Sequence, residues 1–185
     1  MNEIIETEFN DKRLTEDKNN KEKNDALLIR CTKTEDGQKI WQLVKSSGIL
    51  DLNSVYCYLL LCTHFSNTCL VAESNHKLIG FVTAYKIPDD ETTLFIWQTG
   101  IEKAFRGQGI AKKLILELLS SKYCNSINKI QATISPSNTA SMALFKALAR
   151  DLETKLIEQN YFDSGLFPGQ QHEKENLVTI GPLIK

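Results

Sequence analysis

The stretch FRGQGIAKK, residues 105–113, places two glycines one residue apart, between an arginine and the first turn of an apolar helix. Glycine allows backbone conformations in which successive N–H groups point toward one anion. The stretch therefore predicts an anion-binding loop that leads into a helix. The alternative is an ordinary strand-to-helix turn, for which glycine only supplies a permissive backbone.

Two common phosphate-binding motifs are excluded by the residues themselves. A Walker loop requires GxxxxGK[ST], which the sequence lacks. A dinucleotide fingerprint requires three glycines directly after a first strand and an acidic residue about 20 positions later. Here only Gly107 and Gly109 are present, and they follow the fourth predicted strand. The loop is therefore not expected to bind ATP or a dinucleotide.

Apolar patterning around the loop predicts alternating strands and helices. Strands are expected at β-rich apolar runs, and helices where apolar residues recur every three or four positions. Single strands are predicted at residues 26–32, 93–102, 129–134 and 176–184. Two further strands form the arms of a hairpin over residues 68–88, which turns at residues 74–77. The predicted helices are residues 34–48, 54–65, 111–124 and 135–152, and we expect the second helix to be more buried than the first. This order predicts an α/β (α+β) fold with a mixed sheet.

The chain of 185 residues, 42% of them hydrophobic, is large enough to bury the core of one domain. Residues 1–25 consist mainly of charged and amide side chains without apolar periodicity, so we expect a flexible charged tail. A short amphipathic helix on a partner subunit is the alternative for this segment. The predicted domain covers residues 26–185.

Composition excludes several classes of partner. The net charge of −1 provides no basic surface for nucleic acid or for an acidic membrane, and no apolar run reaches the length of about 20 residues that spans a bilayer. The N-terminus lacks the apolar region of a secretory signal. The five cysteines have no metal-binding spacing, and most lie in apolar stretches. We therefore expect a cytoplasmic protein with buried, reduced thiols and without a metal site.

The run R-G-Q-G-I-A fits the pattern [QR]-x-x-G-x-[GA], and in this it resembles the Gcn5-related N-acetyltransferases. The resemblance implies that the loop binds the pyrophosphate of acetyl-CoA as a co-substrate. Backbone N–H groups and the positive end of the helix dipole would hold the phosphates, with side-chain charge added at the rim. The predicted cofactor-binding residues of this loop are Arg106, Gly107, Gln108, Gly109, Ile110, Ala111 and Lys112.

In the fold that this resemblance implies, the strands before and after the helix splay apart at the cofactor site, and helices cover both faces of a mostly antiparallel sheet. The pantetheine arm would then bind to the backbone near Ile101. Asn138, at the head of the next helix, would face the cofactor arm. Asn138 is also a suitable helix N-cap, either in addition or as its sole role.

Four further segments resemble the L-2,4-diaminobutyrate acetyltransferases, a family of ectoine biosynthesis, over nearly all of residues 27–182. They are LDLNSVYCYLLLCTHFSNTC (50–69), LFIWQTGI (94–101), NTASMALF (138–145) and LFPGQQHEKENLVTI (166–180). The resemblance implies transfer of an acetyl group to the γ-amine of diaminobutyrate, giving N4-acetyl-L-2,4-diaminobutyrate and CoA. It also implies a homodimer. Alternatives are an acetyltransferase for another small amine, such as a polyamine or an aminoglycoside, and a non-catalytic acetyl-CoA-binding protein.

The resemblance assigns substrate contacts to Asp51, Tyr56, Trp97, His172 and Glu175, and the residue types fit the substrate. Carboxylates can hold the two ammonium groups, an indole ring can face an alkylammonium, and the phenol and imidazole can donate hydrogen bonds. Strand alternation places Thr99 on the same face as Trp97, and it joins the predicted substrate site. Each residue has an ordinary alternative: Asp51 as a helix N-cap, Tyr56 and Trp97 as core residues, and His172 and Glu175 as solvated loop residues.

Catalysis requires a base, because an alkylammonium with a pKa of about 10.4 is almost fully protonated near neutral pH. We assign this role to Glu175, with Asp51 as the second candidate, acting directly or through a water. Many relatives have a tyrosine that protonates the leaving thiolate at the position of Phe145. Phenylalanine cannot donate a proton. The thiolate then leaves unaided or receives a proton from a hydroxyl such as that of Tyr56.

Overall fold

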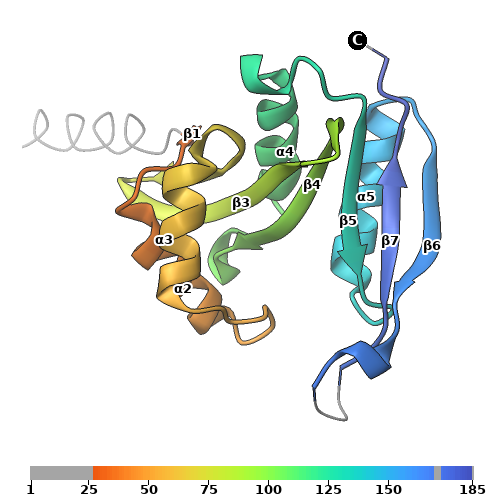
Figure 1. Cartoon of the computed structure of the whole chain (residues 1–185). Coiled ribbons are helices and arrows are strands. Elements are labelled where there is room, and N and C mark those ends of the chain that lie inside the picture. The colour runs from red at the N-terminus through yellow and green to blue at the C-terminus, as the bar shows by residue number, and fades with distance from the viewer. Residues whose placement is uncertain (1–26, 169–171, 185) are drawn as a thin grey trace, which may run out of the picture.

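The computed structural model describes residues 27–168 and 172–184. The predicted tail, residues 1–25, lies outside the described residues. In the described part of the chain, seven strands form one sheet in the order β1-β2-β3-β4-β5-β7-β6 (Figure 1). The strands are β1 (Leu28–Cys31), β2 (Leu70–Ser74), β3 (Lys77–Ile87), β4 (Asp90–Ile101), β5 (Lys129–Ile134), β6 (Leu156–Phe162) and β7 (Glu175–Ile180). All neighbouring strands are antiparallel except β4 and β5.

Helices cover both faces of the sheet (Figure 1). They are α2 (Asp36–Ser47), α3 (Val55–His64), α4 (Ile110–Ser120) and α5 (Thr139–Asp151). The α2/α3 core joins these two helices to β2 and β3 and includes Ile40, Tyr58, Cys62, Val71 and Phe81. The α4/α5 core lies on the opposite face and includes Val82, Ile96, Leu114, Ile115, Leu118, Phe145 and Leu148. The predicted fold, a mostly antiparallel α+β sheet with helices on both faces, is confirmed.

The parallel strands β4 and β5 separate partway along their length. They pair only where Thr93–Phe95 of β4 lie beside Lys129–Gln131 of β5. Beyond that point β4 continues to Ile101 and β5 to Ile134 without pairing, while the other edge of β5 pairs with β7 from Ile130 to Ile134. One edge of β4 is thus left without a neighbouring strand in the described structure. This divergence is the predicted splay, and it leaves backbone groups of β4 available to a ligand.

Two expectations about elements are wrong. No strand was predicted at residues 156–162, where β6 lies, because LIEQNYF is exposed at nearly every position and shows no apolar periodicity. The helix α3 is also not the more buried one: within it only Tyr58 and Cys62 are buried. Among its leucines, Leu60 is exposed and Leu59 and Leu61 are half-buried, because a single row of side chains faces the sheet.

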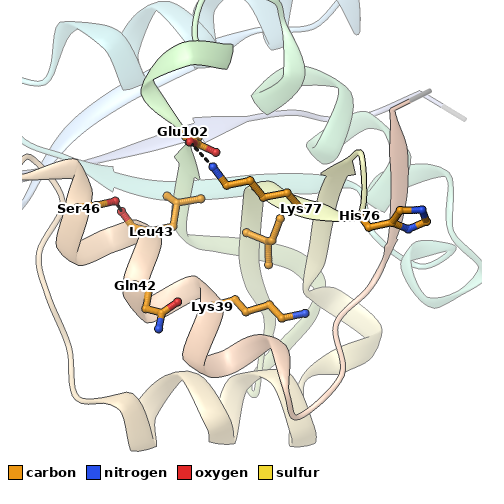
Figure 2. Close-up of a pocket in the computed structure, with 8 residues that line it drawn as sticks. Lys39, Gln42, Leu43, Ser46, His76, Lys77 and Glu102 are labelled. Carbon is orange, nitrogen blue, oxygen red and sulfur yellow. Dashed lines mark hydrogen bonds and ion pairs between the residues drawn. The ribbon is translucent and has the colours of Figure 1, made fainter. Parts of the chain in front are cut away.

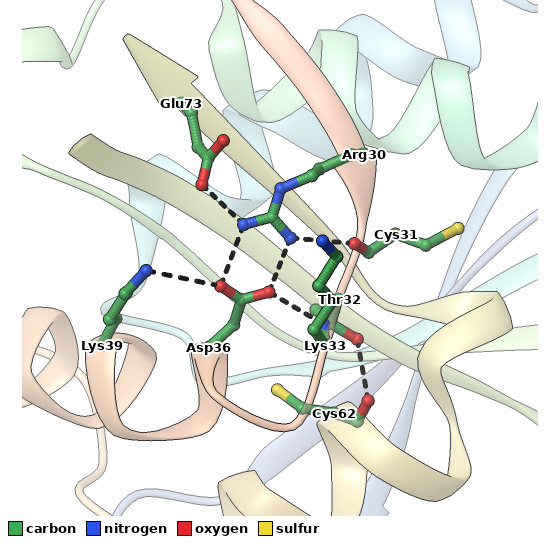
Figure 3. Close-up of polar contacts among 8 residues, drawn as sticks. All are labelled: Arg30, Cys31, Thr32, Lys33, Asp36, Lys39, Cys62 and Glu73. Atoms are coloured by element: carbon green, nitrogen blue, oxygen red, sulfur yellow. Dashed lines mark hydrogen bonds and ion pairs between the residues drawn. The ribbon is translucent and has the colours of Figure 1, made fainter. Parts of the chain in front are cut away.

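A half-buried ion cluster ties the first strands to α2 (Figure 3). Arg30 on β1 donates to both oxygens of Asp36 at 2.6 and 3.0 Å and to Glu73 on β2. Burial alone would raise the pKa of Asp36, but hydrogen bonds from Arg30 and from the Lys33 N–H lower it below its ordinary value. The cluster therefore holds the start of α2 against the edge of the sheet in its charged form.

Three general expectations concern thiols, membranes and metal ions. Cys31, Cys57, Cys62 and Cys69 are free thiols, and burial raises the pKa of Cys62 and Cys69 to about 11 and about 12. Over residues 27–168 and 172–184, no helix has the length and apolar character needed to cross a bilayer. Within the same residues, no group of three or more His, Cys, Asp or Glu side chains is arranged to hold a metal ion.

Candidate active site

A cavity of about 820 Å3 lies where β4 and β5 separate. Its walls come from the end of β4, the loop before α4, the first turn of α4 and the start of α5. The predicted cofactor residues that line it are Ile101, Arg106, Gly107, Gly109, Ile110, Ala111, Lys112 and Asn138. Gln108 is the one that does not line it, and its amide group faces the carbonyl of Ala104. The cavity has the position and the lining that acetyl-CoA requires.

The two glycines of the loop adopt conformations that other residues avoid. Gly107 has φ of 78°, and Gly109, the N-cap of α4, has φ of 74°. No side chain or backbone atom lies within 4 Å of where their Cβ atoms would be. Glycine is therefore required here for its backbone conformation and not for lack of space, as a loop that turns its N–H groups toward a ligand demands.

Charged and polar side chains complete the rim of this cavity. Arg106 Nε donates to the carbonyl of Ile101 at 3.0 Å, which fixes the loop against the end of β4. Lys112 forms an ion pair with Asp151 at the end of α5. Asn138 accepts a hydrogen bond from the Ser141 N–H at 3.0 Å while it lines the cavity. Both roles considered for Asn138, N-cap and cavity residue, are thus compatible.

The side chains of β4 do not alternate strictly, because the β3–β4 ladder shifts register at Trp97. Trp97 packs against the α2/α3 core, beside Tyr58. Thr99 pairs with Val82, which belongs to the α4/α5 core, and it lines the cofactor cavity. The prediction that Trp97 and Thr99 share a face is wrong, because a β-bulge reverses the alternation between them.

A chain of hydrogen bonds attaches the α2–α3 loop to β4. Tyr58 OH donates to Gln98 Oε1 at 2.9 Å, and Gln98 Nε2 donates to the backbone carbonyl of Asp51 at 2.9 Å. Ser54, and not Asp51, is the N-cap of α3, since its hydroxyl accepts from the Cys57 N–H. The carboxylate of Asp51 is therefore not used to cap a helix, and its loop is held close to the bulge of β4.

Glu175 begins β7 and lies across the splay from this loop. Its carboxyl is half-buried, and burial raises its pKa; the charge of His172 opposes this shift, while the charge of Asp51 adds to it. The hydroxyl of Thr133 also faces the carboxylate. Two carboxylates from opposite ends of the chain thus lie in each other's field, as a site for a substrate with two amines requires.

His172, near Glu175, is held in place by two contacts of its imidazole ring. Its ring stacks on Phe167, with ring centroids 3.7 Å apart and planes 13° apart, and its Nδ1 is 2.7 Å from the carbonyl of Glu173. Glu173 itself accepts from the Ser137 N–H at 3.0 Å, next to the cofactor cavity. The segment 172–175 is therefore held by Phe167 and by Ser137 of the cofactor cavity, and it is not a simply solvated loop.

The two remaining aromatic residues occupy different environments. Tyr56 is 68% exposed on the first turn of α3, so its alternative as a core residue is wrong. Phe145 is 3% exposed in the α4/α5 core, and it does not line the cavity. Its neighbour Leu144 lines the cavity instead. No proton donor therefore occupies the position where relatives have a tyrosine.

A second cavity, of about 430 Å3, lies between α2 and the β2–β3 turn (Figure 2). Lys39 and Lys77 stand at its edges, and its carboxylate, Glu102, forms an ion pair with Lys77 at 2.7 Å. A site for an alkylammonium needs a carboxylate that is not already neutralised by a lysine. This cavity is therefore a poor candidate for amine chemistry.

The geometry places the cluster around Glu175 and the cavity lined by the glycine loop on the two sides of β4. Four residues that support or complete this arrangement were not among the predicted site residues: Gln98, Tyr58, Thr133 and Leu50. Gln98 follows Trp97 directly, but its role depends on the bulge in β4, which no local pattern in LFIWQ indicates. The positions of Tyr58, Thr133 and Leu50 depend on long-range packing.

Comparisons with known proteins are consistent with this geometry. The model of the "Acetyltransferase (GNAT) family" matches residues 38–149. An L-2,4-diaminobutyric acid acetyltransferase of Halalkalibacterium halodurans is 46% identical over 158 residues, which are 85% of this chain and 83% of the relative. One of Marinococcus halophilus is 44% identical, over 87% of this chain and 93% of the relative. The diaminobutyrate acetyltransferase EctA of Paenibacillus lautus, solved with L-2,4-diaminobutyric acid and coenzyme A, has a TM-score of 0.84 and 37% identity, over 87% of this chain and 98% of that one.

Proposed function

This chain belongs to the acetyltransferase (GNAT) family, and we propose that it transfers the acetyl group of acetyl-CoA to the γ-amino group of L-2,4-diaminobutyrate. The products are N4-acetyl-L-2,4-diaminobutyrate and CoA, a step of ectoine biosynthesis. The observation that carries the proposal is the cavity lined by the glycine loop, together with a half-buried Glu175 that lies in the electrostatic field of Asp51 and His172. The backbone of Asp51 is held to β4 by Gln98. Relatives named for this reaction cover most of the chain and support it.

The substrate's charges match the side chains at this point. Asp51 and Glu175 are the carboxylates that would hold the two ammonium groups, and Trp97 would offer its ring face to an alkylammonium. His172 and Tyr56 are the donors for the substrate carboxylate. A substrate with two amines and one acid would therefore be held at both ends.

Deprotonation of the amine is the step that the environment of Glu175 favours. Burial raises the pKa of Glu175 toward the range in which a carboxylate is an effective general base. The neutral nitrogen then attacks the carbonyl carbon of the thioester, and the electron pair of the C=O bond moves to oxygen. Collapse of this tetrahedral state breaks the C–S bond and expels the CoA thiolate. One proton of the ammonium group passes to Glu175 before attack, directly or through a water. The second proton, which nitrogen loses as the amide forms, passes through water to the departing thiolate or to solvent.

The leaving group needs no dedicated acid in this protein. The pKa of a thiol is about 8.5, so a thiolate is an acceptable leaving group near neutral pH. Phe145 lies in the core and has no donor to offer. A hydroxyl from Tyr56 or from solvent is sufficient to return a proton after departure.

An amine panel tests the proposed substrate. Thiol release from acetyl-CoA is measured with diaminobutyrate, ornithine, lysine and putrescine at equal concentrations, and kcat/KM is expected to be highest on diaminobutyrate. Putrescine is the informative control, because it has two amines and no carboxylate. Equal kcat/KM on diaminobutyrate and putrescine contradicts the choice of substrate. Binding of coenzyme A without thiol release on any amine would favour the alternative of a non-catalytic acetyl-CoA-binding protein.

The proposal includes a homodimer in the cytoplasm. At the end of the sheet, β6 exposes Ile157 (56%) and Tyr161 (51%) together with the backbone groups of its outer edge. An edge strand of this kind is usually covered by another chain, or carries charged side chains that prevent it from pairing with one. We therefore expect Tyr161→Lys to convert a dimer to a monomer in light scattering, while Tyr123→Lys, on the loop after α4, leaves the mass unchanged. A wild-type monomer contradicts this part.

A further inference from the structure

We infer that Thr99 is a catalytic residue whose hydroxyl donates a hydrogen bond to the carbonyl oxygen of the acetyl thioester. The inference rests on the proposed acetyl transfer and assigns a donor within that site. It begins from an isolated polar atom: Thr99 Oγ1 is buried and has no hydrogen-bond partner among the described residues. A buried hydroxyl is normally hydrogen-bonded, so an unpaired one on a residue that lines the cofactor cavity is available to donate to a bound ligand.

The bulge at Trp97 is what brings this hydroxyl to the cofactor. With strict alternation, Thr99 would face α3 together with Trp97. Because the ladder shifts register at Trp97, Thr99 instead pairs with Val82 and faces the α4/α5 core. It lines the cofactor cavity there, while Gln98 on the opposite face supports the α2–α3 loop. One bulge thus divides neighbouring residues between the amine site and the thioester site.

The order of residues along β4 gives the position of the thioester. Within the cavity, β4 contributes Thr99, Gly100 and Ile101. Arg106, at the start of the phosphate loop, binds the carbonyl of Ile101. Since a strand rises about 3.3 Å per residue, Thr99 lies about 7 Å further from that loop than Ile101 does. It is therefore the member of β4 at the end of the cavity opposite the phosphates.

That end of the cavity is also where the amine arrives. Gln98, the next residue toward the bulge, holds the backbone of Asp51, and Asp51 lies in the field of Glu175. The thioester carbon must lie between this cluster and the phosphate loop for the amine to reach it. A donor at Thr99 would meet the carbonyl oxygen there and would bind it more strongly as it becomes an oxyanion. The proton stays on Thr99 throughout.

The inference is tested by comparing acetyl-CoA with CoA, because only acetyl-CoA has the carbonyl oxygen. The affinities of wild-type protein, Thr99→Val and Thr99→Ser for both ligands are measured by calorimetry without an amine. Thr99→Val is expected to reduce the preference for acetyl-CoA over CoA by about three- to tenfold. Its kcat should fall by about a hundredfold, as for loss of an oxyanion donor. Thr99→Ser, which keeps the hydroxyl, should restore most of both.

Thr179→Val is the matched control, since Thr179 is also a half-buried threonine on a strand of this sheet but accepts its hydrogen bond from Gln131. It should leave the ratio of affinities unchanged. Thr99→Ala serves the same comparison if the valine variant does not fold. An unchanged ratio, or equal losses for acetyl-CoA and CoA, overturns the assignment. Because the binding measurement uses no amine, it stays valid if diaminobutyrate is not the substrate.

Discussion

Glu175 combines three features that suit a general base. It begins a strand, it is half-buried, and it lies near Asp51, so burial and a like charge both raise its pKa while His172 lowers it. A raised pKa means that the carboxylate is protonated, and inactive as a base, at a higher pH than an ordinary glutamate. Activity should therefore fall on the acidic side through a pKa above that of a free glutamate.

Glu175→Gln is expected to lower kcat by about a hundredfold or more and to remove this acidic limb from the pH–rate profile. The measurement is kcat/KM on diaminobutyrate from pH 4 to 9, with the affinity for CoA as a check on folding. Glu117→Gln, on the exposed side of α4, is the matched control. An unchanged acidic limb in Glu175→Gln would assign the base elsewhere, with Asp51 next.

Trp97 is half-buried beside Tyr58, and its position at the bulge places it on the face of β4 that carries the α2/α3 core. Loss of a ring that faces an alkylammonium costs about 0.5–2 kcal/mol, in addition to lost contact area. Trp97→Ala should therefore raise KM for diaminobutyrate by about tenfold or more and leave the affinity for acetyl-CoA nearly unchanged. Trp41→Ala is the control, since Trp41 packs against the same core from α2. Equal losses for both ligands would make Trp97 a core residue only.

At the scale of elements, the phosphate loop and α4 act as one unit. Gly109 caps α4 in a left-handed conformation, and no neighbouring atom lies where its Cβ would be. A side chain there is disfavoured by its φ of 74°, at about 1–2 kcal/mol, and not by a clash. The N–H groups of the loop would then turn away from the phosphates.

Gly109→Ala is therefore expected to weaken acetyl-CoA binding by about tenfold, with KM for diaminobutyrate little changed. Calorimetry with acetyl-CoA measures the first, and steady-state kinetics the second. Gly165→Ala, at a glycine without neighbours within 4 Å and without a left-handed conformation, is the matched control. Equal affinity in Gly109→Ala and wild type would show that the loop accepts a side chain and that its glycines are not needed by the phosphates.

At the scale of the whole molecule, the Arg30–Asp36–Glu73 cluster connects β1, β2 and α2. Asp36 is 2% exposed, so removing its charge leaves Arg30 with one partner fewer in a half-buried position. Breaking such a pair costs about 3 kcal/mol of unfolding free energy. Asp36→Asn should lower the midpoint of urea unfolding at pH 7 without a change in the slope.

The pH dependence of this loss follows from the lowered pKa of Asp36. A carboxyl with a lowered folded-state pKa stabilises the protein above its unfolded pKa of about 3.9, and the contribution disappears as the pH falls through the folded-state pKa. The difference between wild type and Asp36→Asn should therefore shrink below pH 4. Asp89→Asn, at an exposed position in the β3–β4 turn, is the control. A difference that is constant from pH 7 to pH 2 contradicts the role of the charge.

Local patterns in the sequence were sufficient for most elements and for the cofactor loop. The glycine loop and most elements follow from short-range signals: glycine placement, apolar periodicity and helix caps. The splay of the two strands and the cavity positions of Ile101 and Asn138 were implied by the resemblance to the Gcn5-related N-acetyltransferases. The strand β6 could not be predicted in this way, because nearly all of its side chains are exposed and only its pairing with β7 makes it a strand. The exposure of α3 depends likewise on which row of its side chains meets the sheet.

The sequence by itself determined the fold family, the co-substrate and the residue types of the amine site. Only the tertiary structure decided which residues meet. A one-residue bulge in β4 reversed the side-chain alternation after Trp97 and moved Thr99 from the predicted substrate face to the cofactor cavity. The approach of Asp51 and Glu175, 124 positions apart in numbering (175 minus 51), likewise depends on the packing of a loop and a strand across the splay. Local patterns carry no information on such contacts, because the free energy that fixes them comes from burial and hydrogen bonds between distant segments.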